Sequence, residues 1–267
     1  MAHFYRDQQV SNLKIDGDVL RQIDSVFQAR GVLLNQQVLN ESEQGNKSFL
    51  TYVIRFDEKG YRLFSIGDLI DYFHKAGYVE RILFTVETGD SLRSNRQVGS
   101  HLELRLDKKG GNSCYLSVTS DDSDWVDSSF SAVQENLQKN RTRNGWARSA
   151  WIQFLVQIVG VTLGFVLSLW AAFNLESKLS MESPFIISFL FVLLIFSNTW
   201  TYLNKQILCF IDNTFPNIEF YRPKKDTIHW LIQTVVGGVF LAIVLYFLSV
   251  VFSYFTDILS GFVNRNT

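Results

Sequence analysis

The chain contains few cysteines and histidines, which excludes several kinds of site. Its 267 residues include two cysteines, Cys114 and Cys209, and four histidines that are scattered along the sequence. A disulfide framework or a Cys–His metal site needs several of these residues at characteristic spacings. We therefore expect no disulfide and no bound metal. No other residue pattern implies a cofactor.

The chain also lacks an excess of charge of either sign, with 25 Lys and Arg against 26 Asp and Glu. Nucleic-acid-binding domains carry a clustered basic face, so we expect no nucleic acid partner. The charges are unevenly distributed, because residues 1–148 hold 19 basic and 20 acidic residues while residues 149–267 hold 6 of each. This division predicts a soluble domain over residues 1–145 and a membrane domain over residues 146–267.

The motifs of the common enzyme classes are missing too. There is no GxSxG, HExxH or kinase signature, and the KKGG sequence at 108–111 lacks the context of a phosphate-binding loop. The densest acidic cluster lacks the central glycine of a calcium loop and lies at an expected helix start, where acids favour the helix dipole. Its members are Asp121, Asp122, Asp124 and Asp127. The sequence therefore predicts a protein that is not an enzyme and has no catalytic residues.

Three stretches contain no Asp, Glu, Lys or Arg, namely 149–175, 183–204 and 227–256. Each is longer than the roughly 20 residues that cross a bilayer as a helix. They predict transmembrane helices over about 150–174, 184–204 and 229–255. Lys and Arg are concentrated before the first span and between the second and third. The positive-inside rule then predicts a multi-pass protein, in the plasma (inner) membrane, with a cytoplasmic N-terminal domain and the C-terminus on the opposite side.

The expected cytosolic loop, residues 205–228, is rich in apolar residues but is interrupted by Pro216 and Pro223. Two placements are open for its first part, residues 205–220. It lies along the membrane interface as a short amphipathic helix, or it packs against the N-terminal domain.

Small and polar residues form stripes inside the expected spans. The first span has glycines at a GxxxG spacing, which lets another helix approach closely. The amides lie at similar depth, so we expect them to meet one another. The residues are Gln153, Gln157, Gly160 and Gly164 in the first span, Asn198 in the second, and Gln233 and Gly238 in the third. They are interpreted either as sites that pack the three helices together or as the lining of a polar cavity or pore between protomers.

The N-terminal domain alternates helical and strand patterns. Helices are expected over 18–30, ended by Gly31, from the N-cap Ser65 through Ala76, and over 123–143. Strands with alternating apolar residues are expected over 49–56, 61–64, 78–88, 101–107 and 113–120. The fold class is therefore α+β, an antiparallel sheet of about five strands with helices on one face, followed by an all-α membrane domain of three transmembrane helices. We also expect residues 1–142 to fold without lipid.

The polar segment 89–100 carries Arg93 and Arg96 and is the candidate ligand loop for an anionic molecule. The leading hypothesis is an integral membrane protein whose cytosolic sensor domain recognises a protein or a small ligand. Its spans would anchor it in the lipid bilayer and assemble it with other copies of itself. The alternative is a homo-oligomeric ion-conducting pore, or a membrane-disrupting effector, gated by the N-terminal domain.

Overall fold

The computed structural model describes residues 3–37, 47–108, 113–180 and 182–222, together with 234, 235, 237, 238, 242, 246 and 249. The chain divides into two units, Met1–Arg222 and Pro223–Thr267. The third expected span belongs to the second unit and lies almost entirely outside the described residues, so it stays a prediction. All the named helices and strands belong to the first unit.

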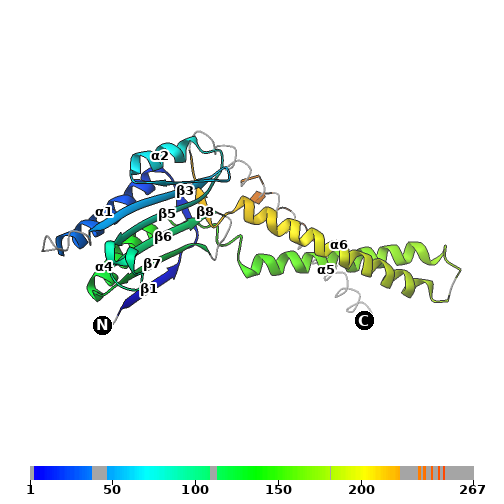
Figure 1. The fold of residues 1–267 in the computed structure, drawn as a ribbon. Helices are drawn as coiled ribbons and strands as arrows, with labels where there is room; N and C mark the ends of the chain where they lie inside the picture. The colour runs from blue at the N-terminus through cyan, green and yellow to red at the C-terminus, as the bar shows by residue number, and fades with distance from the viewer. Residues whose placement is uncertain are drawn as a thin grey trace, which may run out of the picture. The chain divides into compact units, whose positions relative to one another are not determined.

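The first unit contains an antiparallel sheet of six strands, one more than expected (Figure 1). Their order across the sheet is β1-β7-β6-β5-β3-β4. The strands are β1 (Phe4–Gln9), β3 (Ser48–Phe56), β4 (Lys59–Leu63), β5 (Val79–Thr88), β6 (His101–Asp107) and β7 (Tyr115–Ser120). The additional strand is β1, which pairs with β7 at the edge of the sheet. All six of its residues are exposed, so it lacks the buried apolar alternation by which the other strands were predicted.

Alternate side chains of the central strands build the core. On β5, Ile82, Phe84 and Val86 are fully buried. Because side chains alternate between the two faces of a strand, all three point to the same side of the sheet. Their partners on β6 are equally buried and are Leu106, Leu104 and Leu102, in that order.

Three helices pack over this core: α1 (Gly17–Gln37), α2 (Ile66–Lys75) and α4 (Ser123–Lys139). The expected N-cap of α2 is confirmed, because the Ser65 hydroxyl accepts a hydrogen bond from the Gly67 amide at 3.2 Å. The N-cap of α4 is Asp122, whose carboxylate accepts from the amides of Asp124 and Trp125 at 2.9 and 3.2 Å. The capping interpretation of the acidic cluster therefore holds for Asp122.

Two helix ends differ from the prediction. Gly31 does not end α1, because the helix continues to Gln37 and still buries Leu34 in the core. A Cβ at Gly31 would lie 3.3 Å from the Ser48 hydroxyl. The glycine therefore lets β3 pack close to α1. The helix α4 ends at Lys139, four residues before Arg143.

The first two expected spans form the helices α5 (Ala150–Glu176) and α6 (Pro184–Thr214), which pack against each other as a hairpin. Both are long and apolar enough to cross a membrane, by length and composition. The helix α6 does not end at residue 204 as expected but continues to Thr214. A charged residue such as Lys205 ends an apolar run without ending a helix, since lysine is a good helix former.

The chain then returns to the α+β domain. The strand β8 (Ile218–Phe220) pairs in parallel with β2 (Leu13–Ile15). Ile218 and Phe220 are buried in the same core as the sheet, and the rings of Phe220 and Phe73 of α2 have centroids 6.3 Å apart. The sequence left open whether this segment lies along the membrane interface or packs against the N-terminal domain. Residues 216–222 pack against the domain. The α5–α6 hairpin is thus an insertion in the α+β fold, which it leaves after α4 and re-enters through β8.

Candidate functional site

The helices α1, α2 and α4 leave the second face of the sheet open. Register determines which side chains it carries, because directly paired residues point to the same face. Its charged and ring-bearing residues on the central strands are Phe49 and Arg55 on β3, Arg81 and Glu87 on β5, His101, Glu103, Arg105 and Asp107 on β6, and Tyr115 on β7. The open face therefore carries most of the charged side chains of these strands.

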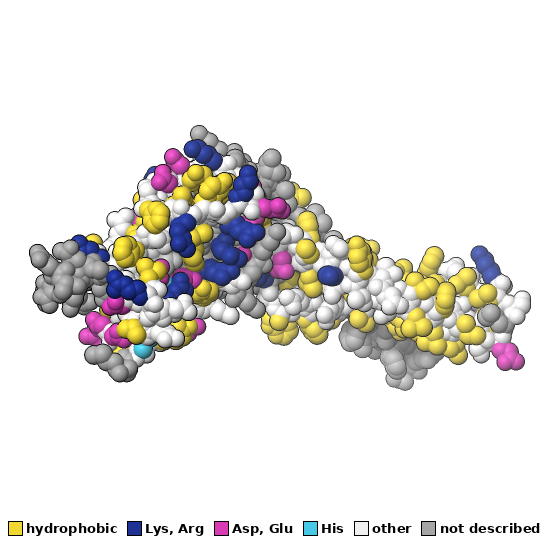
Figure 2. All heavy atoms as spheres, viewed as in Figure 1, with side chains coloured by type: hydrophobic (Ala, Val, Ile, Leu, Met, Phe, Trp, Pro, Cys, Tyr) yellow, Lys and Arg dark blue, Asp and Glu magenta, His cyan; other side chains and the backbone are white. Residues whose placement is uncertain are grey.

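Four arginines gather where β5 begins and β6 ends, and we call them the arginine face: Arg55, Arg62, Arg81 and Arg105. Two carboxylates lie among them. Glu80 pairs with Arg55 at 2.9 Å, and Asp107 lies 2.8 Å from Arg81 and 3.5 Å from Arg105. The arginine face therefore has more positive than negative charge. Figure 2 shows Lys and Arg side chains gathered over the sheet in this view.

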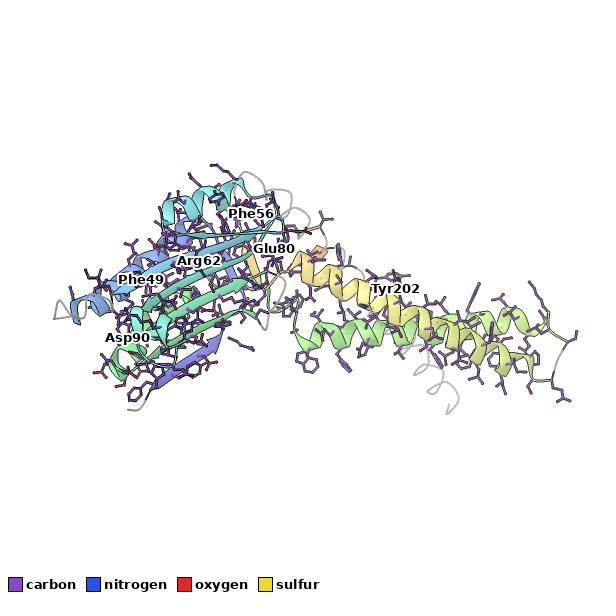
Figure 3. The ribbon with its side chains drawn as sticks, in the orientation of Figure 1. Phe49, Phe56, Arg62, Glu80, Asp90 and Tyr202 are labelled. Carbon is purple, nitrogen blue, oxygen red and sulfur yellow. The ribbon has the colours of Figure 1, made fainter. Side chains whose placement is uncertain are left out.

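Arg62 differs from the other three members of the arginine face. It lies on β4 opposite Val53, is exposed, and forms no ion pair with any residue that the structure describes. Figure 3 labels Arg62 together with Glu80. Because its guanidinium is not engaged by the fold, Arg62 is the arginine best placed to bind an external anion.

A buried carboxylate, Glu103, occupies the other half of the open face. Its side chain is 5% exposed, and Arg96 Nη1 and His101 Nε2 lie 2.9 and 3.3 Å from its Oε2. The Tyr115 hydroxyl donates to its Oε1. Burial alone would raise the pKa of Glu103, but the close approach of His101, the hydrogen bond from Tyr115 and the charge of Arg96 outweigh it and lower the pKa to about 2. Glu103 is thus ionised and fully engaged by its neighbours.

The candidate ligand loop folds back on the sheet. Its first part is the short helix α3 (Gly89–Arg93), and Arg93 pairs at the surface with Asp90 at 3.4 Å. Arg96 turns toward the sheet and binds Glu103 at 2.9 Å and Glu87 at 3.8 Å. The structure therefore separates the two predicted arginines: Arg96 neutralises carboxylates of the domain itself, and Arg93 remains exposed.

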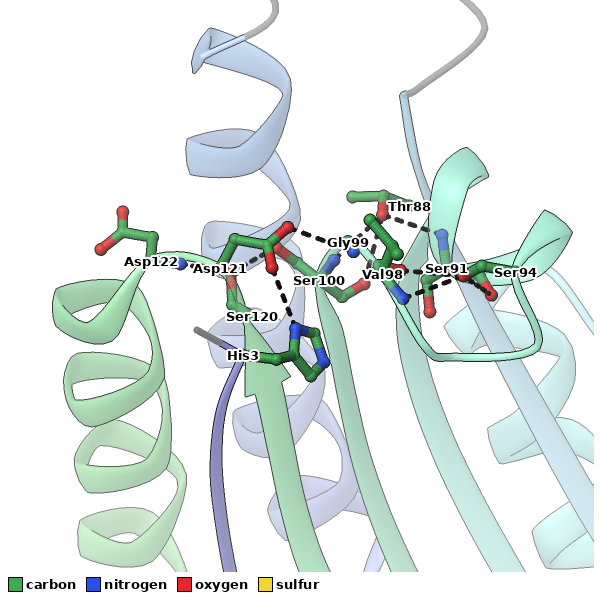
Figure 4. Close-up of polar contacts among 10 residues, drawn as sticks. All are labelled: His3, Thr88, Ser91, Ser94, Val98, Gly99, Ser100, Ser120, Asp121 and Asp122. Carbon is green, nitrogen blue, oxygen red and sulfur yellow. Dashed lines mark hydrogen bonds and ion pairs between the residues drawn. The ribbon is translucent and has the colours of Figure 1, made fainter. Parts of the chain in front are cut away.

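The polar network in Figure 4 closes this loop at the opposite end of β5 and β6 from the arginine face. The Thr88 hydroxyl accepts from the Ser100 amide at 3.1 Å, and the Ser100 and Ser120 hydroxyls are 2.7 Å apart. Gly99 has a φ of +85°, and a Cβ there would lie 2.6 Å from the Thr88 hydroxyl. Only glycine fits this turn without strain.

The same network contains a histidine, a carboxylate and serines, the residue types of a hydrolase triad. His3 Nδ1 lies 3.0 Å from Asp121, and the Gly99 amide donates to the same carboxylate. Within the described residues no serine hydroxyl is hydrogen-bonded to His3, so the arrangement does not build an activated nucleophile. In the same part of the chain no group of three His, Cys, Asp or Glu side chains is placed to hold a metal ion.

The return of the chain after α6 is held by buried polar groups. Asn217 is 3% exposed; its side chain accepts from the Asn12 amide at 3.1 Å and donates to the Val10 carbonyl at 3.3 Å. Arg222 is 8% exposed and donates to the carbonyls of Ala76 and Gly77 at 2.5 and 3.2 Å. Sequence reasoning did not single out these residues, because neither belongs to a motif or a periodic pattern.

A cavity of about 520 Å³ lies beside this return. It is bounded by Tyr78 and Lys108 of the α+β domain, by Arg148 just before α5, and by the last turns of α6. Arg148 Nε lies 3.3 Å from Asp212 of α6, so the two ends of the hairpin are close together here. We call this space the junction cavity.

The hairpin brings together some of the residues predicted within the spans. Gly160 and Gly164 are buried against α6, and a Cβ on them would lie 1.8 Å from Trp200 and 2.4 Å from Phe196 respectively. The GxxxG pair thus allows two aromatic side chains of α6 to pack directly on the α5 backbone.

The amides within the spans are placed differently. Gln153 and Gln157 are exposed on α5, and the exposed Asn198 donates to the Leu194 carbonyl of its own helix at 3.2 Å. The structure brings none of these three side chains into a hydrogen bond with another of them. Gln233 lies outside the described residues. Gly238 is described, and a Cβ there would meet nothing within 4 Å.

Comparison of the chain with family models, with curated proteins and with solved structures found no match. The function is therefore argued from the geometry of the chain itself.

Proposed function

We propose that this chain is an integral membrane protein whose cytosolic α+β domain binds an anionic partner, an acidic protein segment or a small anionic ligand, on its arginine face. Three spans, about 150–174, 184–204 and 229–255, anchor it and assemble it into a homo-oligomer, with the C-terminus across the membrane. The observation that carries the binding role is the open sheet face with its unengaged Arg62.

The surface of the hairpin supports the membrane placement. Large apolar side chains are exposed along both helices, among them Trp151 at 78%, Val161 at 70% and Leu194 at 65%. Soluble proteins rarely expose a continuous apolar surface of this kind. The 27 residues of α5 span about 40 Å at 1.5 Å per residue, enough for a hydrocarbon core of about 30 Å.

The insertion of the hairpin supports a sensing role for the domain. Because both ends of the hairpin are joined to one folded domain, a change in that domain acts on α5 and α6 together. A domain attached to the membrane by a single linker would not have this coupling. We therefore propose that occupancy of the arginine face is communicated to the spans through α4 and β8.

Binding of an acidic probe tests the proposal. Full-length protein in lipid nanodiscs is titrated with a fluorescent polyglutamate peptide and followed by anisotropy. We expect binding that weakens with salt, because exposed charges are screened over about 10 Å at 0.1 M ionic strength. Arg62→Gln should weaken it by about ten-fold or more, since a hydrogen bond to a charged group contributes about 1.5–3 kcal/mol.

The matched control is Arg21→Gln. Arg21 is exposed on α1, a helix of the covered face, and pairs with Asp18 at 3.4 Å. It removes the same charge from a different surface, so binding of the peptide should be unchanged. Equal losses in Arg62→Gln and Arg21→Gln, or no binding at low salt, would contradict a specific site on the arginine face.

The topology has its own test. A reporter that is active only in the cytoplasm should work when fused at residue 1 and fail when fused at residue 267. Activity at both ends would contradict three spans.

The exposed amides favour a second candidate function, a homo-oligomeric pore. Gln153 and Gln157 lie on the surface of α5, where contact with lipid is unfavourable and contact with water or another helix is favoured. If they line a pore, Gln157→Leu should abolish ion flux into liposomes without changing oligomer size, because apolar constrictions dewet. Absence of flux from oligomeric wild type with polyglutamate bound would refute the pore.

A further inference from the structure

The junction cavity lies where the hairpin would leave the membrane, a placement that rests on the proposed function. The 31 residues of α6 span about 46 Å at 1.5 Å per residue, whereas a hydrocarbon core is about 30 Å thick. The charge-free part of α6 ends at Asn204, so the remaining residues, 205–214, reach through the headgroup layer. Thr201 and Asn204, at the end of the charge-free part, and Lys205 and Leu208 of this stretch line the cavity.

Cations line the cavity from three directions. Lys205 comes from α6, Lys108 follows β6, and Arg148 precedes α5. One acid, Asp212, lies among them and is paired with Arg148 at 3.3 Å. Lys205 is exposed and forms no ion pair with a described residue, and Lys108 Nζ lies 4.3 Å from the ring centroid of Tyr78. The cavity is therefore electropositive at the level of lipid phosphates.

The lining also has an apolar wall, formed by Leu208 and Pro216. The cavity thus combines cations with a surface suited to carbon.

We infer that the junction cavity binds the headgroup of an anionic phospholipid. The phosphate would lie between Lys205 and Lys108, and the glycerol carbons would contact Leu208. Its volume of about 520 Å³ is within the range of about 300–1,000 Å³ typical of ligand sites. Such a lipid would join the α+β domain to the hairpin at the membrane surface.

Binding of phosphatidylglycerol to the delipidated full-length protein tests this inference by native mass spectrometry from detergent. Phosphatidylglycerol carries a phosphate and a net negative charge, and phosphatidylcholine is the neutral comparison. We expect phosphatidylglycerol to be retained and phosphatidylcholine to be lost. Lys205→Gln should weaken retention about five-fold, the effect of about 1 kcal/mol per cation near a lipid surface. Lys205→Arg should restore it.

The matched control is Lys178→Gln, which removes a lysine just beyond the other end of α5, away from the cavity lining. Retention of phosphatidylglycerol should be unchanged in this variant. Equal losses in Lys178→Gln and Lys205→Gln, or equal retention of both lipids, would overturn the site. Glycerol phosphate that displaces the lipid at equal concentration would overturn a lipid ligand in favour of a soluble phosphate.

Failure of the inference is distinguishable from failure of the proposed function. Extraction of cell membranes with alkaline carbonate separates integral from peripheral proteins. A chain released by carbonate contradicts the membrane placement itself. A chain that resists carbonate and shows no lipid preference contradicts only the lipid in the junction cavity.

Discussion

A chain cut before the hairpin should lose part of the core of the α+β domain. A fragment of residues 1–148 contains all six strands of the main sheet but lacks β8, which fills the core beside α2. The informative comparison is a linked domain in which a flexible linker of about ten residues replaces the hairpin and joins residue 148 to residue 215. Such a linker reaches about 17 Å, and Arg148 already lies 3.3 Å from Asp212.

The size of the effect follows from what β8 buries. Ile218 and Phe220 are 0% and 5% exposed. Removing a buried Ile or Phe side chain costs about 2–5 kcal/mol each. The side-chain hydrogen bonds of Asn217 and Arg222 add about 1 kcal/mol apiece. The total of roughly 6–12 kcal/mol is comparable to the whole stability of a typical domain, about 5–15 kcal/mol.

Thermal unfolding followed by circular dichroism measures the difference. We expect the linked domain to unfold cooperatively and the fragment of residues 1–148 to aggregate or show no transition. In the linked domain, Phe220→Ala should cost about 3–5 kcal/mol. The neighbouring Tyr221→Ala should cost about 0.5–1 kcal/mol, because the Tyr221 ring is only part-buried and its contact is with Lys14 Nζ at 3.7 Å.

Equal stability of the fragment and the linked domain would refute this reasoning, since β8 would then contribute nothing to the core. The structure already changes the expectation that residues 1–142 fold without lipid. That expectation rested on the alternating strands and capped helices of the first half. These local patterns give no sign that residues 218–220 form a strand of the same domain.

Three further outcomes are expected. Glu103 has a pKa of about 2 against an ordinary 4.5, so its ionised form stabilises the folded domain by about 3 kcal/mol. This stabilisation is present above pH 4.5 and is lost as the pH falls toward 2. Chemical denaturation of the linked domain at different pH values should show the loss, and the Glu103→Gln variant should not show it. Gly160→Leu should destabilise the full-length protein in detergent, because even a Cβ would lie 1.8 Å from Trp200; Val161→Leu, on the exposed side, should not. Gly99→Ala should lower the melting temperature of the linked domain, because its φ of +85° disfavours any side chain.

The sequence predicts the parts of the fold whose physics is local. Alternating apolar residues locate β5, β6 and β7, and the hydroxyl of Ser65 locates the start of α2. The charge-free runs locate α5 and most of α6, because a helix that is long and apolar enough to cross a bilayer can be recognised from local sequence. These features depend on residues close together in the chain.

The features that sequence reasoning missed depend on partners far apart in the chain. The strand β1 is polar throughout and exists because β7 offers it an edge. The strand β8 pairs with residues about 200 positions earlier. The ion pair of Arg96 could not be predicted from its polar local segment, because its partner Glu103 lies on the neighbouring strand and is buried.

The candidate site shows the same limit. The spacing of Arg55, Arg81 and Arg105 in the sequence does not indicate a common site. Each lies on a different strand, and only the register of the strands places them on one face. The junction cavity likewise combines a residue that follows β6, a residue that precedes α5 and residues of α6, which have no common motif. The glycines of α5 were predictable as a packing site, whereas their partners Trp200 and Phe196 were not.

The central claim is that both ends of the apolar hairpin are joined to one α+β domain, and a disulfide between β2 and β8 tests it most directly. Lys14 and Glu219 are paired, part-exposed residues of adjacent parallel strands. Neighbouring strands lie about 4.8 Å apart, within the range a disulfide can bridge. Lys14→Cys with Glu219→Cys, in a Cys209→Ser background and in native membrane vesicles, should form this disulfide on mild oxidation, identified by mass spectrometry of the linked peptides. Lys14→Cys with Lys178→Cys should not. Linkage of residue 14 to residue 178, or no linkage to residue 219, would contradict the insertion of the hairpin in the domain.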